Sequence, residues 1–485
     1  MKVARTLLGM GKKYTRREYL SCLVGIGALG TAWLVGNQFA GVEQAVTQSL
    51  TSTSSSGESL GGGCPTTTIT ETQTTIPTTN TNDAYLIVNA ALTAGQTSIH
   101  LPAGNYIASQ TITVECIPNL EIYGDGMDST IITLDPNVLG HVIQLRACDN
   151  FHVHDLQING NKTNQAGGNS TEQYDYNGIN TYLSNNGLIE RCLILNCRNF
   201  GIELAGSPAN ITVQNCLVQN SDANGINVNC NPGGGGNIIQ DTTVDGFSDV
   251  GITLLGNANH LVQRCTVKNG TLNTSPYSLN THIGITGSEG INDSSVNPSG
   301  TTSHILNNTI ENCYSSGDFY PGSGITMQGA GNLLFDIENN NIIGCEIGIR
   351  ISEVAGATIL NNTINGFGDT NGYAIKVVGS SLNVNIQGTL IENLPANLVS
   401  GGIVQIQGGQ GQFINNTIYS NGNKKVIVVS SSVSEDWVTT PNTITESAPV
   451  PEFPVGIQVL FLLALIACGQ LARRASRKHR PEVEE

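Results

Sequence analysis

Short alternating runs of apolar and polar residues repeat at a regular interval through the middle of the chain. The dipeptide Gly-Ile marks the repeat: most of its intervals span 23 to 28 residues, and the two longer intervals contain polar insertions. The repeats begin at Gly178, Gly201, Gly225, Gly251, Gly284, Gly324, Gly348, Ala374 and Gly402. Segments such as "GIELAG" and "ITVQNCLVQN" alternate at the spacing of a β-strand. A fixed period in this range indicates one structural unit per repeat, so the pattern predicts an all-β solenoid of stacked parallel coils.

A second column of the repeat predicts how each coil turns. Eight apolar residues align with one another, and three positions after each comes a small residue that can form hydrogen bonds: Cys192, Cys216, Thr242, Cys265, Asn308, Asn340, Asn362 and Asn416. We expect these side chains to point inward and to stack about 4.8 Å apart as a ladder. The residue before each of them is polar and is predicted to face solvent.

Three segments resemble a known group of proteins. "NDAYLIVNAALTAGQTSIHLPAGNYIASQTITV" (82–114), "NLEIYGDGMDSTIITL" (119–134) and "FHVHDLQINGN" (151–161) are similar to the N-terminal coils of right-handed parallel β-helix proteins of the pectate-lyase-like superfamily. The resemblance implies a right-handed parallel β-helix over residues 82–432, with a short N-terminal capping helix. It says little about the reaction, because lyases, hydrolases, epimerases and non-catalytic proteins share this fold.

The N-terminal segments predict export. Residues 1–40 place six basic residues, among them Lys12, Lys13, Arg16 and Arg17, ahead of an apolar run, which is the order of an export signal or of an uncleaved membrane anchor. "TRREYL" (15–20) resembles the twin-arginine export motif. The Ser- and Thr-rich segment 41–81 has too few apolar residues to fold and is predicted to be a stalk.

The C-terminal segments predict retention at the cell surface. Residues 433–454 are predicted to be a linker ending in "PEFP", and residues 455–471 carry no charge and reach the lower limit of a bilayer span, roughly 17–25 residues. Residues 472–485 form a basic tail that should stay cytoplasmic. This order resembles the archaeal PEF-type sorting signal, which implies a membrane sorting enzyme as a partner. We therefore expect an extracellular, membrane-anchored protein.

The charge of the middle of the chain excludes one class of partner. The two ends hold eleven of the 21 Lys and Arg residues and four of the 37 Asp and Glu residues, which leaves ten basic and 33 acidic residues in 41–454. A segment with a net charge of about −23 repels nucleic acid. No nucleic-acid partner is expected.

Cysteines, histidines and sequons add further expectations. Cys192 and Cys216 fall on adjacent coils, as do Cys313 and Cys345, so each pair could form a disulfide or pack as two buried thiols. Two histidines in "FHVHDL" share one face of a strand, but no third ligand is evident nearby, so no metal site is predicted. Nine Asn-X-Ser/Thr sequons are predicted to be accessible to glycans.

The third residue of each Gly-Ile strand is predicted to point outward and to form one polar row. Its members are Asn180, Glu203, Asn227, Thr253, Thr286, Thr326, Arg350 and Lys376. Three loops enter just before this strand and carry aromatic residues, whose faces suit sugar rings. The related enzymes bind polysaccharide at this place. We predict a polysaccharide partner, with the substrate-binding residues Tyr174, Tyr176, Asn180, Tyr182 and Asn227.

Charged residues three positions before each Gly predict a catalytic cluster. Asp175, Arg198 and Asp222 occupy this position on successive coils, with Glu203 nearby. Carboxylates could act as acid and base in glycoside hydrolysis, or hold Ca²⁺ against a uronate during elimination. No other cofactor is predicted. The other interpretation is an exposed ladder of neutralising charges, in which each pair contributes less than about 1 kcal/mol.

Two hypotheses about function follow from the sequence. In the first, a surface-anchored β-helix binds a neutral or weakly charged polysaccharide and processes it as a lyase or hydrolase. In the second, a non-enzymatic surface or adhesion glycoprotein uses a rigid solenoid to display loops and glycans. New reducing ends or unsaturated products from a glycan panel would distinguish them.

Overall fold

The computed structural model describes residues 82–446, apart from short gaps at 166–175, 231–232, 257–258, 271–281, 289–300, 315–321, 330–332, 368–371, 396–397, 399–401 and 434–435. The predicted export signal, stalk, membrane-spanning segment and basic tail lie outside these residues. Within the described part of the chain, no helix has the length and apolar character needed to cross a membrane.

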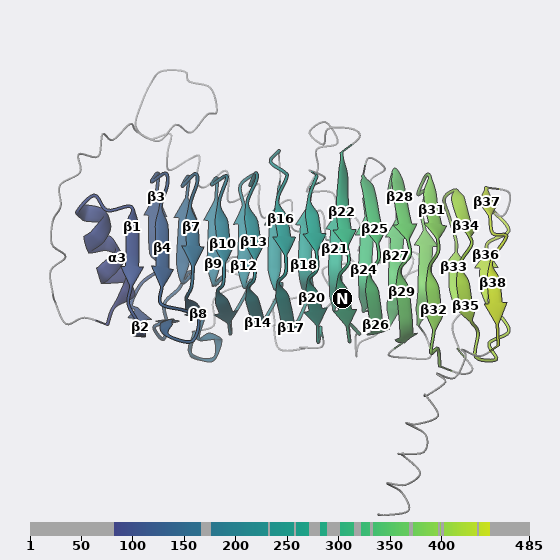
Figure 1. Ribbon diagram of the computed structural model, residues 1–485, viewed down its shortest axis with the longest axis horizontal. Coiled ribbons are helices and arrows are strands. Elements are labelled where there is room, and N and C mark those ends of the chain that lie inside the picture. Colours follow the sequence, from purple (N-terminus) through teal and green to yellow (C-terminus); the bar gives the residue numbers. More distant parts are fainter. Residues whose placement is uncertain are drawn as a thin grey trace, which may run out of the picture. The chain divides into compact units, whose positions relative to one another are not determined.

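Three parallel sheets make up the fold (Figure 1). Sheet 1 contains β1 (Ser98–Leu101), β4 (Glu121–Gly124), β7 (His152–His154), β10 (Leu188–Glu190), β13 (Thr212–Gln214), β16 (Ile238–Gln240), β19 (Leu261–Gln263), β22 (Thr302–Leu306), β25 (Leu334–Glu338), β28 (Gly356–Leu360), β31 (Val384–Gln387), β34 (Gly411–Ile414) and β37 (Trp437–Val438). Sheet 2 contains β2 (Gly104–Ala108), β5 (Thr130–Leu134), β8 (Gln157–Asn159), β11 (Leu193–Leu195), β14 (Leu217–Ser221), β17 (Thr243–Phe247), β20 (Thr266–Lys268), β23 (Thr309–Glu311), β26 (Asn341–Cys345), β29 (Thr363–Phe367), β32 (Leu390–Glu392), β35 (Thr417–Tyr419) and β38 (Thr443–Thr445). Sheet 3 contains β3 (Ile112–Glu115), β6 (Ile143–Arg146), β9 (Ile179–Tyr182), β12 (Ile202–Ala205), β15 (Ile226–Asn229), β18 (Val250–Leu255), β21 (Ile283–Ser288), β24 (Ser323–Gln328), β27 (Ile347–Ser352), β30 (Tyr373–Val378), β33 (Val404–Ile406) and β36 (Ile427–Val429).

The chain winds as a right-handed parallel β-helix in which each coil contributes one strand to each sheet, except that the last coil has described strands in sheets 1 and 2 alone. The Gly-Ile repeats stack in register, so that Ile202 pairs with Ile226 and Ile226 with Ile252. The second column aligns in the same way, with Ile189 beside Val213 and Val213 beside Ile239. The solenoid and the register predicted from the sequence are confirmed.

The repeated glycine has a steric cause. A Cβ atom on Gly178 would lie 2.7 Å from the carbonyl oxygen of Gly201, and a Cβ on Gly201 would lie 2.7 Å from that of Gly225. Real side chains do not tolerate such contacts with backbone. At these positions the backbone of sheet 3 therefore approaches the neighbouring coil too closely for a larger residue, which explains why Gly precedes Ile in most coils, although position 374 carries Ala.

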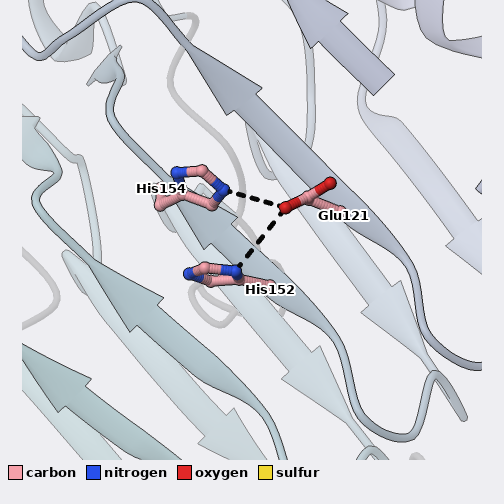
Figure 2. A group of neighbouring side chains, drawn as sticks. All are labelled: Glu121, His152 and His154. Atoms are coloured by element: carbon pink, nitrogen blue, oxygen red, sulfur yellow. Dashed lines mark hydrogen bonds and ion pairs between the residues drawn. The ribbon is translucent and has the colours of Figure 1, made fainter. Parts of the chain in front are cut away.

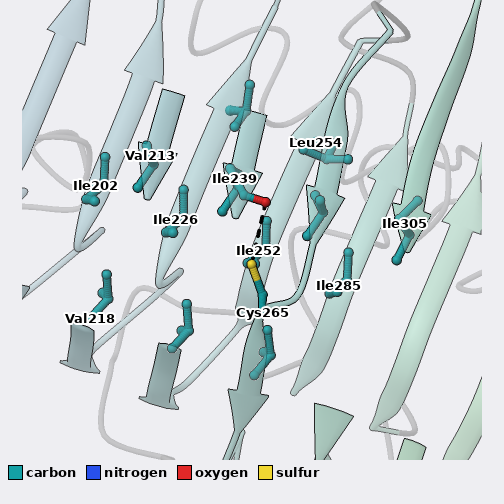
Figure 3. Packing of buried hydrophobic residues seen from close by; sticks show 14 of the residues in the cluster. Ile202, Val213, Val218, Ile226, Ile239, Ile252, Leu254, Cys265, Ile285 and Ile305 are labelled. Atoms are coloured by element: carbon teal, nitrogen blue, oxygen red, sulfur yellow. Dashed lines mark hydrogen bonds between the residues drawn. The ribbon is translucent and has the colours of Figure 1, made fainter. Parts of the chain in front are cut away.

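Aliphatic side chains fill the interior in stacks that run along the solenoid. Ile202, Ile226, Ile252 and Ile285 lie one above another from sheet 3, and Val213 and Ile239 do the same from sheet 1 (Figure 3). Each of these side chains is at most 1% exposed. Burial of a side chain of this size contributes roughly 1.5–3 kcal/mol, so the stacks hold successive coils together.

The predicted ladder is present at the turn between sheets 1 and 2. The backbone N–H of Asn308 donates to Oδ1 of Asn340 at 2.9 Å, and that of Asn340 donates to Oδ1 of Asn362 at 2.9 Å. The amide of Asn340 also donates to the carbonyl of Ile305 at 2.8 Å. These buried turns are thereby satisfied by the coils on either side.

The polar column before the ladder occupies left-handed backbone conformation. Its members have φ angles between 49° and 57° and are Arg191, Asn215, Asp241, Arg264, Asn307, Asn339, Asn361 and Asn415. Asn and Asp tolerate this region better than other side chains that carry a Cβ. All but Arg191 are exposed, so the column faces solvent as predicted.

A helix packs against the first coil of the solenoid, and two short strands form its last coil. Helix α3 (Ala84–Thr93) begins at Asp83, whose side chain accepts a 3.0 Å hydrogen bond from the backbone N–H of Tyr85, and the helix contacts β1, β2 and β3. At the other end, β37 and β38 pair with β34 and β35, so the coils continue past residue 432 to Thr445. The first part of the segment predicted to be a linker, 433–454, therefore belongs to the last coil.

The paired cysteines pack as buried thiols. Cys192, Cys216, Cys313 and Cys345 are free and at most 4% exposed. Burial raises the pKa of the Cys192 and Cys313 thiols, and it raises the pKa of Cys197 to about 12. Cys116 is disulfide-bonded, and its partner lies outside the described residues.

Candidate functional site

The outer face of sheet 3 carries the polar row that the sequence predicts. Glu203 of β12 pairs with Asn180 of β9 and with Asn227 of β15. The row continues in register through Thr253, Thr286, Thr326 and Arg350 to Lys376. Adjacent members lie one strand spacing, about 4.8 Å, apart. The structure also adds Gln144 before Asn180 and Gln405 after Lys376.

The middle of this row is buried, whereas its ends are accessible. Asn180, Glu203 and Asn227 are 5%, 6% and 4% exposed, but Gln144 and Lys376 are only half-buried. Polar side chains at such depth need partners within the protein. The row is therefore a hydrogen-bonded network at its middle and an accessible surface toward its ends.

Glu203 lies at the centre of a cage of amides. Its Oε2 accepts hydrogen bonds from the side-chain amides of Asn177 at 2.6 Å and Asn180 at 2.7 Å. Its Oε1 accepts from the amide of Asn227 at 3.5 Å. Hydrogen bonds to a charged group contribute about 1.5–3 kcal/mol each, so these amides compensate a carboxylate that is almost shielded from water.

Asn177 is itself fixed from both sides. Its Oδ1 accepts from the side-chain amide of Asn199 at 3.0 Å and from the backbone N–H of Phe200 at 3.1 Å. Its own backbone N–H donates to Nδ1 of His141 at 3.3 Å. The side chain that holds Glu203 is therefore positioned by residues from the coils before and after it.

The other predicted charged residues flank the row and have partners of their own. The guanidinium carbon of Arg198 lies 5.1 Å from the ring centroid of Tyr176, and Nη1 of Arg198 donates to the carbonyl of Gln165 at 3.2 Å. Oδ1 of Asp222 lies 2.8 Å from Nζ of Lys162. The backbone N–H of Asp222 donates to the carbonyl of Cys197, which places it one coil after Arg198. The predicted residues Tyr174 and Asp175 lie outside the described residues.

Tyr182 is the exposed aromatic residue at the N-terminal end of the row. It is 38% exposed on β9, and the guanidinium carbon of Arg146 lies 5.4 Å from its ring centroid. Arg146 in turn pairs with Glu115 at 3.1 Å. Together with Gln144, Tyr182 offers an aromatic face beside hydrogen-bonding groups.

Two cations mark the C-terminal end of the row. Arg350 and Lys376 pair in register, and Nζ of Lys376 lies 4.7 Å from the ring centroid of Tyr373. Burial lowers the pKa of Lys376, and the charge of Arg350 lowers it further, against the opposing effect of Glu346. This end of an acidic chain is locally basic.

Sequence reasoning missed Asn177 and Lys162. Asn177 precedes Gly178, and Asn224 precedes Gly225 in the same way. An Asn immediately before a repeat glycine is therefore the sequence pattern that identifies these two residues. Asn224 also serves the network, because its amide donates to Thr253 Oγ1 at 2.9 Å. Lys162 lies 60 residues before Asp222, and nothing in the local sequence links the two.

Comparisons with known proteins agree with the fold. No protein-family model matches the chain, and no curated protein matches it significantly in sequence. The catalytic unit of the thermostable GH87 alpha-1,3-glucanase of Streptomyces thermodiastaticus strain HF3-3 is similar in structure, with 14% identity, 75% of this chain and 66% of that chain covered, and a TM-score of 0.50. A GH87 alpha-1,3-glucanase catalytic domain in complex with tetrasaccharides has 15% identity, 73% and 67% coverage and a TM-score of 0.49. The A-module of the Azotobacter vinelandii mannuronan C-5 epimerase AlgE4 has 16% identity, 77% and 97% coverage and a TM-score of 0.41. The chain spans about two thirds of the glucanase chains.

Proposed function

We propose that this protein binds a polysaccharide along the outer face of sheet 3. The observation that carries the proposal is the row from Gln144 to Gln405, in which hydrogen-bonding side chains recur on successive coils in register. A polysaccharide also repeats along its length and presents hydroxyl groups that both donate and accept hydrogen bonds. The accessible members at the ends of the row, Gln144, Lys376 and Gln405, can form hydrogen bonds with such a ligand, whereas the amides and threonines between them are buried.

Two further observations support a neutral or weakly charged glycan. The acidic chain, with a formal net charge of −16, disfavours polyanions. Tyr182 and the half-buried Tyr373 stand at the two accessible ends of the row and offer faces for sugar rings. The similar fold of an alpha-1,3-glucanase catalytic unit is consistent with a sugar ligand for this type of solenoid.

Binding rather than turnover is the function that the geometry supports best. Hydrolysis of a glycosidic bond uses two carboxyl groups that can reach the reacting atoms. Glu203 is enclosed by three amides, and Asp222 is paired with Lys162. Lyase or hydrolase chemistry by Asp175, Arg198, Glu203 and Asp222, with or without Ca²⁺, remains a prediction from the sequence.

We also propose that the protein acts outside the cell, held at the membrane by its terminal segments. The support is the sequence alone: the export-like segment 1–40, the uncharged segment 455–471 and the basic tail 472–485. In this arrangement a sorting enzyme recognises the "PEFP" region, and the solenoid presents sheet 3 to the glycans of the cell envelope.

The test is a binding measurement on the full-length chain with a panel of neutral and uronate polysaccharides, with and without Ca²⁺. We expect retention by at least one neutral polysaccharide. Tyr182→Ala should weaken this binding by roughly 1–2 kcal/mol, as for an exposed aromatic contact residue. The matched control is Tyr419→Ala, because Tyr419 ends β35 on the outer face of sheet 2, away from the row.

Three outcomes bear on the proposal. Equal binding by wild type and Tyr182→Ala, or no retained polysaccharide, would contradict it and favour the non-enzymatic display protein. Release of reducing ends or of unsaturated products would show that the chain also processes its ligand. Loss of binding in Tyr419→Ala alone would move the site to sheet 2.

A further inference from the structure

Two histidines and a glutamate meet on the outer face of sheet 1 (Figure 2). Val153 at the middle of β7 is fully buried, so His152 and His154 on either side of it face outward. The register pairs His152 with Glu121 of β4, one coil earlier. The strand supplies two candidate ligands, and coil stacking supplies the third.

The three ligand atoms all lie within 4.8 Å of one another. Oε1 of Glu121 lies 3.2 Å from Nε2 of His154 and 3.8 Å from Nδ1 of His152. The ligand atoms of a tetrahedral Zn²⁺ site lie about 3.3 Å apart, given metal–ligand bonds of about 2.0–2.1 Å. The separation between Glu121 and His154 already matches this spacing, and side-chain rotations that shorten the wider separations would bring all three atoms to bonding distance.

An outer shell of carboxylates holds both imidazole rings. Nδ1 of His154 lies 2.7 Å from Oδ2 of Asp155, and Nε2 of His152 lies 3.1 Å from Oε1 of Glu190. In each ring the nitrogen that faces Glu121 is the one left for a metal, while the other nitrogen can donate its proton to a carboxylate. Carboxylate–histidine pairs of this kind orient metal ligands and fix their tautomers.

The orientation of Glu121 and the local charge also favour a bound divalent cation. Oε2 of Glu121 accepts a 2.5 Å hydrogen bond from Ser98, which leaves Oε1 directed at the two histidines. Arg191 pairs with Asp155 at 2.7 Å and also with Glu190. With neutral imidazoles, three carboxylates and one guanidinium leave a net charge of −2, which a divalent cation neutralises.

We propose that Glu121, His152 and His154 bind one divalent transition-metal ion of the Zn²⁺ class. Two imidazoles and one carboxylate match the ligand preference of Zn²⁺, whereas Ca²⁺ prefers oxygen ligands only. The side chains of Glu121, His152 and His154 are 37%, 29% and 12% exposed, so the site is open to an ion from solvent. Three protein ligands leave the fourth position to water, and the ion joins two successive coils. This site lies on a different sheet from the proposed glycan surface.

The test measures metal binding by the full-length chain purified without a histidine tag. Titration with Zn²⁺ should show one equivalent bound, and Co²⁺ should give the visible absorption of a tetrahedral site. We expect His154→Gln to weaken Zn²⁺ binding at least 100-fold and Asp155→Asn to weaken it about 10–100-fold, as outer-shell substitutions do. Addition of Zn²⁺ should raise the melting temperature of wild type and leave that of His154→Gln unchanged.

The matched control is His304→Gln. His304 also faces outward from sheet 1 and lies 3.0 Å from a carboxylate, that of Asp336, but its strand carries no second histidine and the neighbouring His260 is buried. Glu121→Gln is a second variant in case His154→Gln does not fold, because it retains the shape of the side chain. The proposal is overturned if folded wild type binds no Zn²⁺, or if Glu121→Gln and His154→Gln bind it as tightly as His304→Gln does.

Discussion

The side-chain amide of Asn177 donates a 2.6 Å hydrogen bond to Oε2 of Glu203, a residue of the next coil. This contact joins the turn before one Gly-Ile strand to the outer face of the following strand. It also explains how a carboxylate that is 6% exposed remains in the row. The outer face of sheet 3 is therefore part of the stabilising framework as well as a candidate binding surface.

Asn177→Ala should destabilise the protein by roughly 2–3 kcal/mol, because it removes a donor from a buried carboxylate and leaves other amides without their acceptor. Urea denaturation followed by circular dichroism measures the change. Asn105→Ala is the matched control, since Asn105 is exposed on β2 and a surface substitution should stay within about 0.5 kcal/mol. Equal stability of the two variants would show that the cage around Glu203 contributes nothing.

Asn340→Ala should lower the free energy of unfolding by roughly 3 kcal/mol. The substitution removes the acceptor for Asn308 and the donor to Ile305 at a position that is 1% exposed, and buried groups left without partners cost about 1–3 kcal/mol each. The measurement is again urea denaturation. A decrease in the free energy of unfolding of less than about 0.5 kcal/mol would mean that water molecules satisfy the groups that Asn340→Ala leaves unpaired.

Two substitutions of Asn339, the neighbour of Asn340, test the importance of the backbone conformation of the turn. Its φ of 56° lies in the left-handed region, where a β-branched side chain is strongly disfavoured. Asn339→Val should therefore cost about 1–2 kcal/mol, while Asn339→Gly should be nearly neutral because glycine reaches this region freely. Thermal melting of both variants decides the matter, and a Gly variant as unstable as the Val variant would contradict the conformational explanation.

His141 should make the fold sensitive to mild acid. Burial, with a smaller effect of Arg146, lowers the pKa of His141 to about 4, against about 6.5 in an unfolded chain. As pH falls below about 6.5 the unfolded chain takes up a proton that the folded chain refuses, so stability declines until the pH reaches about 4. The full effect is about 3 kcal/mol.

The measurement for His141 compares urea denaturation at pH 7 and at pH 4.5. His141→Gln removes the titrating group and keeps an acceptor near the backbone N–H of Asn177. The variant should lose less stability than wild type over this interval, and identical losses would assign the acid sensitivity to other groups.

The sequence by itself determined the coil. The Gly-Ile period, the inward ladder and the outward row all follow from positions that recur at fixed spacing, and the steric limit at Gly178 or the buried turn at Asn340 acts within one repeat and its neighbour. A constraint that acts within every repeat produces a sequence pattern at the same period, and this pattern predicts the coil.

Only the tertiary structure decided which side chains meet and how far they are buried. The row member Glu203 is enclosed, Asp222 pairs with Lys162 rather than standing in an open cluster, and Glu121 lies beside His152 and His154. Asn177 and Glu203 are separated by 26 positions, Glu121 and His154 by 33, and Lys162 and Asp222 by 60. The reason is physical: stacking brings distant residues to about 4.8 Å regardless of the loop between them, so contact and burial depend on how whole coils superpose.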